Sequence, residues 1–546
     1  MVNHSSHLPR PAPLPRFVTV GFVGKRKLGV AGESLTQALE NVLDHLAADH
    51  PSPAHQLVGL SSLALGADSL FAEACAHRGH LHQVYLPEPA SRFFDKADFE
   101  DDDELVQRSR GLLSADNVIE VRVASRADDR GERFAETGFE IAAECEVLLV
   151  ACPEAEAEAA LADPSAPASP LTRGSSAETL RHARRLGRRL FVIQLDKQAA
   201  DGTLAIREIP APDAALAASA HAEPDFFAAD PPAPLAGLDF RAALNAIKNQ
   251  ASADAGRAKF WFVNGGLFVL LAHILATIVA AWAVVMHPQN LLDILLGYAK
   301  FLFLFAGLAI AWILHHRAGQ RRWLRARLIA EICRSTIALL GKKGNPQAPT
   351  FPGSLRHLRD FHLGELAAFT KSLNILFLRE VRRQGLDSHA LATVHAFAQA
   401  YVGARLDAPK SQGGQIAFYK EKADAAKILR RRFDRFFFGF ALAATLLAGA
   451  ALVWQPHDEP WLRVALKFLP LTLPVAAVGA VGWIALRDLD REAERYTDML
   501  KVLRSLRDPL LCAETLGQLR RGVQRVERAL LQEVVEWYAK MNYHRV

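Results

Sequence analysis

Three segments within the first 200 residues carry the residue types that bind phosphate. They are GFVGKR at residues 21–26, GLSSLALGAD at residues 59–68 and GSSAET at residues 174–179. Glycine lets a backbone N–H approach an anion closely, while lysine and arginine supply positive charge. We therefore expect a ligand-binding site made by Gly21, Gly24, Lys25, Arg26, Gly59, Ser61, Ser62, Gly66, Asp68, Gly174, Ser175, Ser176, Glu178 and Thr179.

Each segment alone also has a purely structural interpretation. Ser175 and Glu178 have the spacing of a helix capping box, which needs no ligand. Neither GxGxxG nor GxxxxGK[ST] occurs, so the sequence supports neither a dinucleotide dehydrogenase nor a P-loop NTPase. The His77, His80 and His82 group lacks acidic or cysteine partners, and we expect a surface turn there rather than a metal site.

The elements that position these segments follow from the alternation of apolar runs with helical patterns between residues 17 and 196. Strands are expected at residues 17–23, 56–60, 81–86, 118–123, 147–151 and 190–195. Helices are expected behind Ser34 as N-cap and at residues 68–77, 134–145 and 178–186. This order predicts an α/β domain with a Rossmann-like parallel sheet, whose ligands bind outside the carboxyl ends of the strands.

Four later segments are apolar over about one bilayer thickness. They are residues 265–286, 294–314, 436–454 and 468–486. We expect an all-α membrane domain with four transmembrane helices in two hairpins. Asn264, His273, Lys300 and Thr472 are its polar residues, which favour interhelical bonding or anchoring, and the absence of an acidic relay disfavours a proton-coupled transporter.

The basic residues that flank the spans predict one topology. Lys and Arg precede spans one and three and follow spans two and four, whereas the outer links hold few. Such residues accumulate on the cytoplasmic side, so the protein is expected in the plasma membrane with both termini in the cytoplasm. The charged helices after spans two and four are expected to continue the spans, with their charges on solvated faces.

Composition adds only broad limits. The chain has 546 residues, 50% of them hydrophobic, and a net charge of +5, so no direct nucleic-acid binding is expected. Five scattered cysteines indicate reduced cytosol, and the N-terminus lacks the apolar core of a signal peptide. The expected divisions are a disordered N-terminus at 1–16, the α/β domain at 17–196, an Ala/Pro-rich linker at 197–240, the first hairpin with its helices at 241–340, a cytosolic helical region at 341–426, and the second hairpin with C-terminal helices at 427–546.

The three segments resemble the SLOG superfamily, the Rossmann-like group named for Smf/DprA and LOG proteins. The matching sequences are VGFVGKRKL, GLSSLALGADSLFAEA and GSSAETLRHARRLGRRLFVIQ. The resemblance implies binding of a nucleotide or nucleotide-derived signal, with no other cofactor, and places Glu178 where LOG enzymes carry their catalytic glutamate. The LOG pattern PGGxGTxxE is reduced here to RGSSAE, which favours sensing over hydrolysis.

The membrane half resembles the SLATT group of two-transmembrane effector units. The matching residues are Gln415, Ile416, Phe418 and Tyr419 before span three, and Trp323, Arg327, Glu331 and Arg334 after span two. The resemblance implies a bacterial pore-forming effector, often linked to antiphage defence, and we expect a homo-oligomer in which two such hairpins are fused. The leading hypothesis is thus a nucleotide-gated membrane effector. A membrane-anchored nucleotide N-glycosidase using Glu178 and a non-catalytic membrane scaffold remain alternatives.

Overall fold

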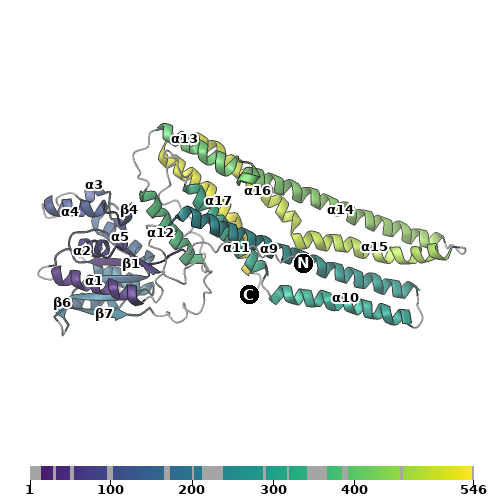
Figure 1. The fold of residues 1–546 in the computed structure, drawn as a ribbon, viewed down its shortest axis with the longest axis horizontal. Coiled ribbons are helices and arrows are strands. Elements are labelled where there is room, and N and C mark those ends of the chain that lie inside the picture. Colours follow the sequence, from purple (N-terminus) through teal and green to yellow (C-terminus); the bar gives the residue numbers. More distant parts are fainter. Residues whose placement is uncertain are drawn as a thin grey trace. The chain divides into compact units, whose positions relative to one another are not determined.

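The chain forms two compact units in the computed structural model (Figure 1). Unit 1 takes in residues 1–243 and 350–387, and unit 2 takes in residues 244–349 and 388–546. The structure describes residues 14–28, 32–49, 55–94, 103–164, 173–199, 202–211, 238–286, 291–316, 319–340, 366–383, 391–454 and 459–543. Most of the N-terminus and of the linker predicted from sequence lie outside the described residues.

Unit 1 is built on a seven-stranded sheet in the order β4-β3-β2-β1-β5-β6-β7. Its strands are β1 (Arg16–Gly24), β2 (His55–Ser61), β3 (Leu81–Leu86), β4 (Val118–Val123), β5 (Val147–Cys152), β6 (Arg189–Gln198) and β7 (Leu204–Ile209). All neighbours pair in parallel except β7, which runs antiparallel to β6. The expected Rossmann-like fold and its six strands are therefore confirmed, while β7 extends the sheet into the range expected to be linker.

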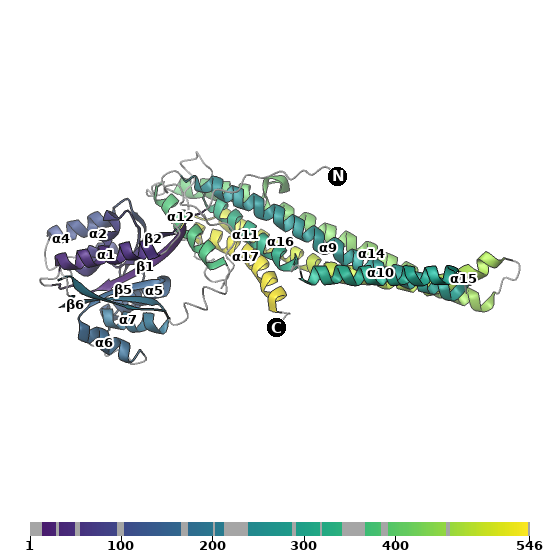
Figure 2. The same ribbon diagram turned by 60° about the horizontal axis from the view of Figure 1, so that its bottom comes forward.

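Helices cover both faces of this sheet (Figure 2). Helices α1 (Gly32–Asp49) and α2 (Ala67–His77) pack on one face, and α5 (Arg130–Glu144), α6 (Glu154–Ala162) and α7 (Ser176–Arg185) pack on the other. Short α3 (Ala90–Phe93) and α4 (Asp103–Leu113) complete the unit near β3 and β4. Strand β5 is buried throughout, as its unbroken apolar sequence VLLVAC requires.

Two expected helix starts are wrong. Helix α1 begins at Gly32, so Ser34 lies inside its first turn and is not the N-cap. Helix α5 begins at Arg130 rather than at residue 134, because the side chain of Asp129 accepts a hydrogen bond from the amide of Glu132. A carboxylate at the N-cap satisfies an amide that the helix leaves unbonded, and this fixes the earlier start.

A helix from between the two hairpins also belongs to unit 1. Helix α12 (Ala367–Arg383) packs against β1 and β4. Lys371 of α12 lies 2.8 Å from Glu146 in an ion pair and donates to Oγ1 of Thr19 at 2.9 Å, and Arg382 donates to the carbonyl of Leu113. The cytosolic region expected at residues 341–426 thus divides between the two units.

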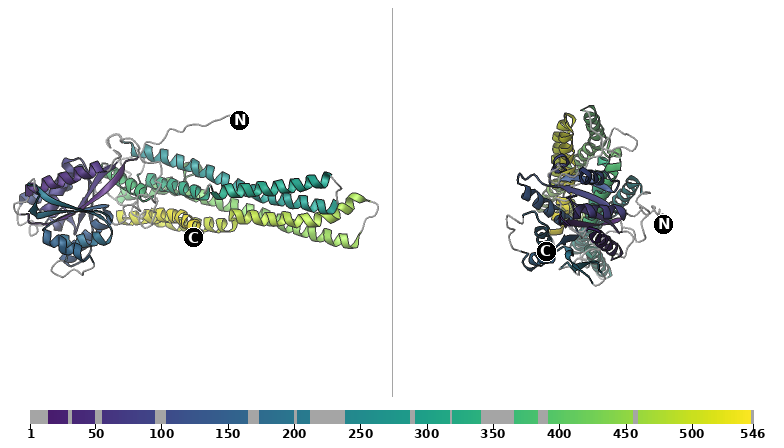
Figure 3. Two further views of the ribbon diagram at one scale, coloured as in Figure 1. Left: turned by 90° about the horizontal axis from the view of Figure 1, so that it is seen from below. Right: turned by 90° about the vertical axis from the view of Figure 1, so that its left-hand side faces the viewer.

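Unit 2 contains four helices that are long and apolar enough to cross a membrane, as expected (Figure 3). They are α9 (Phe240–Met286), α10 (Leu291–His316), α14 (Gln415–Val453) and α15 (Pro460–Arg487). Apolar side chains such as Phe301, Leu308 and Phe438 are more than 60% exposed on them. Surface of that kind is favourable in lipid and costly in water, which is consistent with a membrane protein.

Small residues let these helices approach closely. A Cβ on Gly479 of α15 would lie 2.4 Å from Cδ1 of Ile274 on α9, and one on Gly265 would lie 2.9 Å from Leu314 on α10. Because lipid tails are as apolar as leucine, helices in a membrane associate through close van der Waals packing of this kind. The two hairpins therefore contact each other through α9 and α15.

Further helices of unit 2 lie outside the spans in the residues that the structure describes. They are α11 (Gly319–Leu339), α13 (Leu391–Tyr401), α16 (Leu489–Leu511) and α17 (Leu516–Tyr543), with a π-helical turn at Val402–Leu406. Helices α9 and α14 each begin before their apolar span and continue through it without a break, whereas Asp488 adopts φ +49 between α15 and α16. The expectation that α16 simply continues span four is therefore wrong, because a left-handed residue interrupts the helix.

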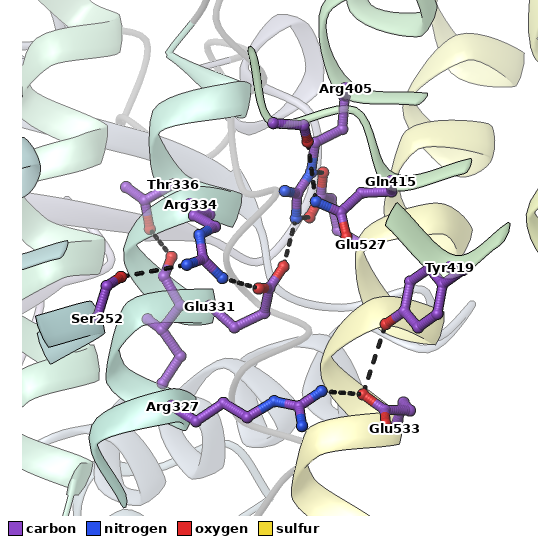
Figure 4. Close-up of polar contacts among 12 residues, drawn as sticks. Ser252, Arg327, Glu331, Arg334, Thr336, Arg405, Gln415, Tyr419, Glu527 and Glu533 are labelled. Atoms are coloured by element: carbon purple, nitrogen blue, oxygen red, sulfur yellow. Dashed lines mark hydrogen bonds and ion pairs between the residues drawn. The ribbon is translucent and has the colours of Figure 1, made fainter. Parts of the chain in front are cut away.

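Charged residues of α11 and α17 form a buried network around Arg405 (Figure 4). Arg405 contacts Glu331 at 2.8 Å and Glu527 at 2.9 Å, and Tyr401 donates to Glu527 at 2.6 Å. Burial raises the pKa of the Glu331 carboxyl, but Arg405 and Arg334 outweigh it and lower this pKa to about 2. The α11 charges expected on a solvated face thus include one buried carboxylate, that of Glu331, which pairs with Arg405 outside the helix.

Candidate functional site at the carboxyl edge of the sheet

The first two predicted segments interlock at the carboxyl ends of β1 and β2. The amide of Gly24 donates to Oδ1 of Asp68 at 3.2 Å, and the hydroxyl of Ser62 donates to Oδ2. The amide of Ala67 donates to the carbonyl of Lys25 at 3.0 Å. Gly66 has φ +94, and a Cβ there would lie 2.1 Å from the carbonyl oxygen of Arg26. Only glycine fits this position, because both the backbone angle and the available space exclude a side chain.

Asp68 holds this junction while remaining fully buried. Burial raises the pKa of its carboxyl to about 6, although hydrogen bonds from Ser62 and from the amides of Gly24 and Ala64 oppose the rise. Near neutral pH the group is therefore close to its titration range. A carboxylate in this position accepts bonds and fixes the loops, but its burial keeps it from direct contact with a solvent-borne ligand.

Lys25 lies where the direction of strand order reverses, between β1 and β5. Its ammonium is 2.6 Å from the carboxylate of Glu156, in the first turn of α6, and both side chains are about one-third exposed. In open α/β sheets the crevice at this reversal is the usual ligand site. An anionic ligand would meet the Lys25 cation here and compete with Glu156 for it.

Arg26 lies over the ring of Phe134, with 4.4 Å between its guanidinium carbon and the ring centroid. Phe134 lies near the start of α5, and Arg130, the first residue of that helix, lies 5.9 Å from the same ring. The sequence reasoning missed both α5 residues. The carboxyl-edge rule could have found them, because α5 begins just after the carboxyl end of β4.

The third predicted segment begins α7 and is fixed by its own contacts. Arg173 forms ion pairs with Glu178 at 2.6 Å and with Glu132 at 2.7 Å. The amide of Gly174 donates to Glu178 at 2.7 Å, and the amide of Glu178 reaches the hydroxyl of Ser175 at 3.3 Å. The Glu178 carboxylate is thus occupied by a cation and a backbone amide, so its contacts account for it without a ligand.

Phe134 brings the third segment beside the first. A Cβ on Gly174, at φ +76, would lie 2.8 Å from Cβ of Phe134 and 2.7 Å from the carbonyl oxygen of Gly131. The same phenylalanine ring carries Arg26 on its face. All three predicted segments therefore meet at one edge of the sheet, around the first turn of α5.

Other predicted site residues point into helix packing instead. A Cβ on Gly21 would lie 2.9 Å from Ile141 of α5, and one on Gly59 would lie 2.6 Å from Cys75 of α2. Thr179 is buried, and its hydroxyl oxygen would lie 2.2 Å from a Cβ on Gly138 of α5. Ser176 is also buried. These contacts explain the residue types by close packing of helix on sheet and of helix on helix.

Ser61 pairs with a histidine in the core. Its hydroxyl and Nε2 of His82 lie 3.0 Å apart, and both side chains are buried. Burial lowers the pKa of His82 to about 4, so the imidazole is neutral at pH 7. The expected surface turn is therefore wrong for His82, which lies on buried β3. In the part of the chain that the structure describes, no three His, Cys, Asp or Glu side chains gather as a metal site.

No family model matches this chain. A search of curated proteins likewise finds no match. The resemblances to the SLOG and SLATT groups accordingly stay predictions.

Proposed function

We propose that this protein is a bacterial inner-membrane effector in which unit 1 senses an anionic, nucleotide-derived ligand and controls a pore-forming state of the four spans. Both termini then lie in the cytoplasm, the active form is a homo-oligomer, and antiphage defence is a setting that suits such an effector. Nucleotides suit the site because Lys25 and Arg26 lie where the strand order reverses between β1 and β5.

The position of α12 is the observation that carries the coupling. Its sequence lies between the two hairpins, yet it packs on β1 and β4 and is tied by Lys371 to Glu146 and Thr19. Strand β1 also ends at the ligand segment that contains Gly24 and Lys25. A ligand that binds one conformation of this edge better than another increases the population of that conformation. A helix docked to the same strand is then biased toward the position that this conformation favours.

Sensing is favoured over hydrolysis by the surroundings of Glu178. Its carboxylate is 5% exposed and is already bonded to Arg173 and to the amide of Gly174. A glycosidase acid must reach the bond that it cleaves, and a carboxylate closed off by two such bonds does not. Glu178 therefore suits a role in fixing the start of α7.

The test uses the full-length protein in dye-loaded liposomes, challenged with a panel of nucleotides. We expect one class of nucleotide to raise the melting temperature and to release dye. Lys25→Gln with Arg26→Gln should abolish both responses, whereas Arg207→Gln, which removes an exposed cation from β7, should leave both intact. A nucleotide that binds tightly without releasing dye at any protein density would contradict gating.

A second pair of variants separates binding from coupling. Lys371→Ala should keep the ligand-induced rise in melting temperature but lose dye release, while Arg383→Ala in the exposed last turn of α12 should behave as wild type. Release of free base from a nucleotide, lost in Glu178→Gln, would instead support the hydrolase alternative.

A further inference from the structure

Unit 2 contains a recess at the end of the spans where basic residues gather. The cavity has a volume of about 410 Å³ and lies among α9, α11, α14, α15 and α16, so it is shared by both hairpins. Its cations are Lys259, Lys422, Arg487 and Arg491. It has no part in the ligand site of unit 1.

The charge of this recess favours an anion. Four cations face two carboxylates, those of Asp488 and Glu492, and Arg491 approaches Asp488 at 3.9 Å. Lys259 lies 5.3 Å from the centroid of the Trp323 ring, and Arg487 lies 5.2 Å from that of Trp483. An aromatic face holds a cation in place without neutralising its formal charge. The lining thus keeps positive charge in excess.

The recess lies at the ends of the apolar spans, beside the level at which the headgroup layer of a bilayer would begin. Arg487 is the last residue of α15, and Lys259 precedes the first apolar span, which begins at residue 265, by about 9 Å of helix. The polar layer of a bilayer extends several ångströms beyond the hydrocarbon on each side. Trp323 adds the amphipathic aromatic side chain that is typical of that layer.

Apolar side chains complete the same recess. Phe262 and Val263 continue α9 toward the first span, and Leu429 faces them from α14. Phe262 also stacks near Trp323, with ring centroids 6.4 Å apart. A site that combines cations with an apolar wall at the ends of the spans suits a molecule with an anionic head and hydrocarbon tails. Free phosphate would contact the cations alone.

We propose that this recess binds an anionic phospholipid, whose phosphate lies against Lys259 and Arg487 and whose acyl chains follow the wall formed by Phe262, Val263 and Leu429. Because residues of both hairpins line it, one bound lipid bridges the two. The lipid then stabilises one arrangement of the hairpins relative to each other.

The test measures lipid bound to the full-length protein in mixed detergent micelles, with phosphatidylglycerol against phosphatidylcholine, by native mass spectrometry and thermal shift. We expect phosphatidylglycerol to bind preferentially and to raise the melting temperature. Lys259→Gln with Arg487→Gln should reduce that preference by about fivefold for each cation removed. Inorganic phosphate at matched concentration should give no comparable rise.

The matched control is Arg430→Gln with Arg431→Gln. These two cations lie on α14 near the same end of the spans but line a different recess, so the control removes equal charge without touching the proposed site. Equal binding of the two lipids, an equal loss of preference in the control, or an equal rise with inorganic phosphate would each overturn the proposal. If the double variant does not fold, the comparison of lipids and phosphate on the wild-type protein still decides it.

Discussion

The amide of Gly24 donates to the carboxylate of Asp68 at 3.2 Å, joining the end of β1 to the first turn of α2. Two segments that are 44 residues apart in sequence are thereby held as one surface. A buried carboxylate makes such a bond strong when it is ionised, but the same burial makes ionisation costly. The junction is therefore sensitive to pH.

Asp68→Asn should flatten the pH dependence of unit 1 stability. The folded-state pKa is raised to about 6, so the protonated carboxyl contributes stability below pH ~4, and this contribution is lost as pH rises through 6. The loss is at most about 3 kcal/mol. Chemical denaturation from pH 4 to 8 should show wild type losing stability relative to Asp68→Asn. Parallel profiles for the two proteins would disprove the titration.

Gly66→Ala should destabilise unit 1 and weaken ligand binding. A Cβ at this position would overlap the backbone of Arg26, which belongs to the proposed ligand segment. The free energy of unfolding should therefore fall by about 2 kcal/mol or more. Gly79→Ala is the control, because Gly79 also has positive φ but faces open space, and strain alone costs about 1 kcal/mol. Equal losses in melting temperature would show that the contact with Arg26 has no effect.

Glu156→Gln should raise the affinity for the anionic ligand. It removes the carboxylate that competes for Lys25, and a pair that is about one-third exposed contributes up to about 1 kcal/mol, or roughly fivefold in affinity. Glu158→Gln, two residues along α6 and paired with Arg207, should leave the affinity unchanged. Ligand titration by calorimetry measures both, and an unchanged affinity in Glu156→Gln would place the ligand elsewhere.

Arg405→Met should unfold unit 2 at much lower temperature. It leaves Glu527 buried without its cation and leaves Glu331 paired with Arg334 alone, which costs about 3–5 kcal/mol. Arg507→Gln removes a similar guanidinium–carboxylate pair with Asp407, but that pair is about one-third exposed and should cost less than about 1 kcal/mol. Thermal unfolding in detergent compares the two. Similar shifts would mean that the buried network adds nothing.

Gly479→Leu should separate α15 from α9. The new side chain would overlap Ile274, and overpacking costs about 1–3 kcal/mol. Gly439→Leu on α14 points into open space and should be tolerated, since the new side chain there meets lipid. The melting temperature of each purified variant in detergent tests this, and a tolerated Gly479→Leu would argue against direct contact of the two hairpins.

The sheet and the spans were predictable because each has a signal within one short segment. Strand β5 has an unbroken apolar run, and the spans exceed the length that a bilayer requires. Strand β7, LAIREI, has no regular alternation of apolar and polar residues and lies beside a Pro/Ala-rich stretch, so its own sequence does not predict a strand. It joins the sheet through antiparallel pairing with β6.

The sequence predicted which edge of the sheet holds the candidate site, but it did not predict the contacts that the site residues make. The carboxyl-edge rule located Lys25, Arg26 and Asp68, yet it could not show that Gly21 and Gly59 admit helices rather than a ligand. Partners such as Lys25 with Glu156, or Arg405 with Glu527, lie more than 100 residues apart in sequence. Their pairing depends on the folded arrangement, which periodicity does not encode.

The chain enters unit 1 twice, first for the sheet and again for α12. A gene fragment that ends at residue 243 would encode the sheet without the helix that packs on β1 and β4. Such a fragment should expose the apolar surface that α12 covers and should tend to aggregate. A soluble version of this unit needs residues 366–383 returned to it, either as a fused segment or as a peptide added in trans.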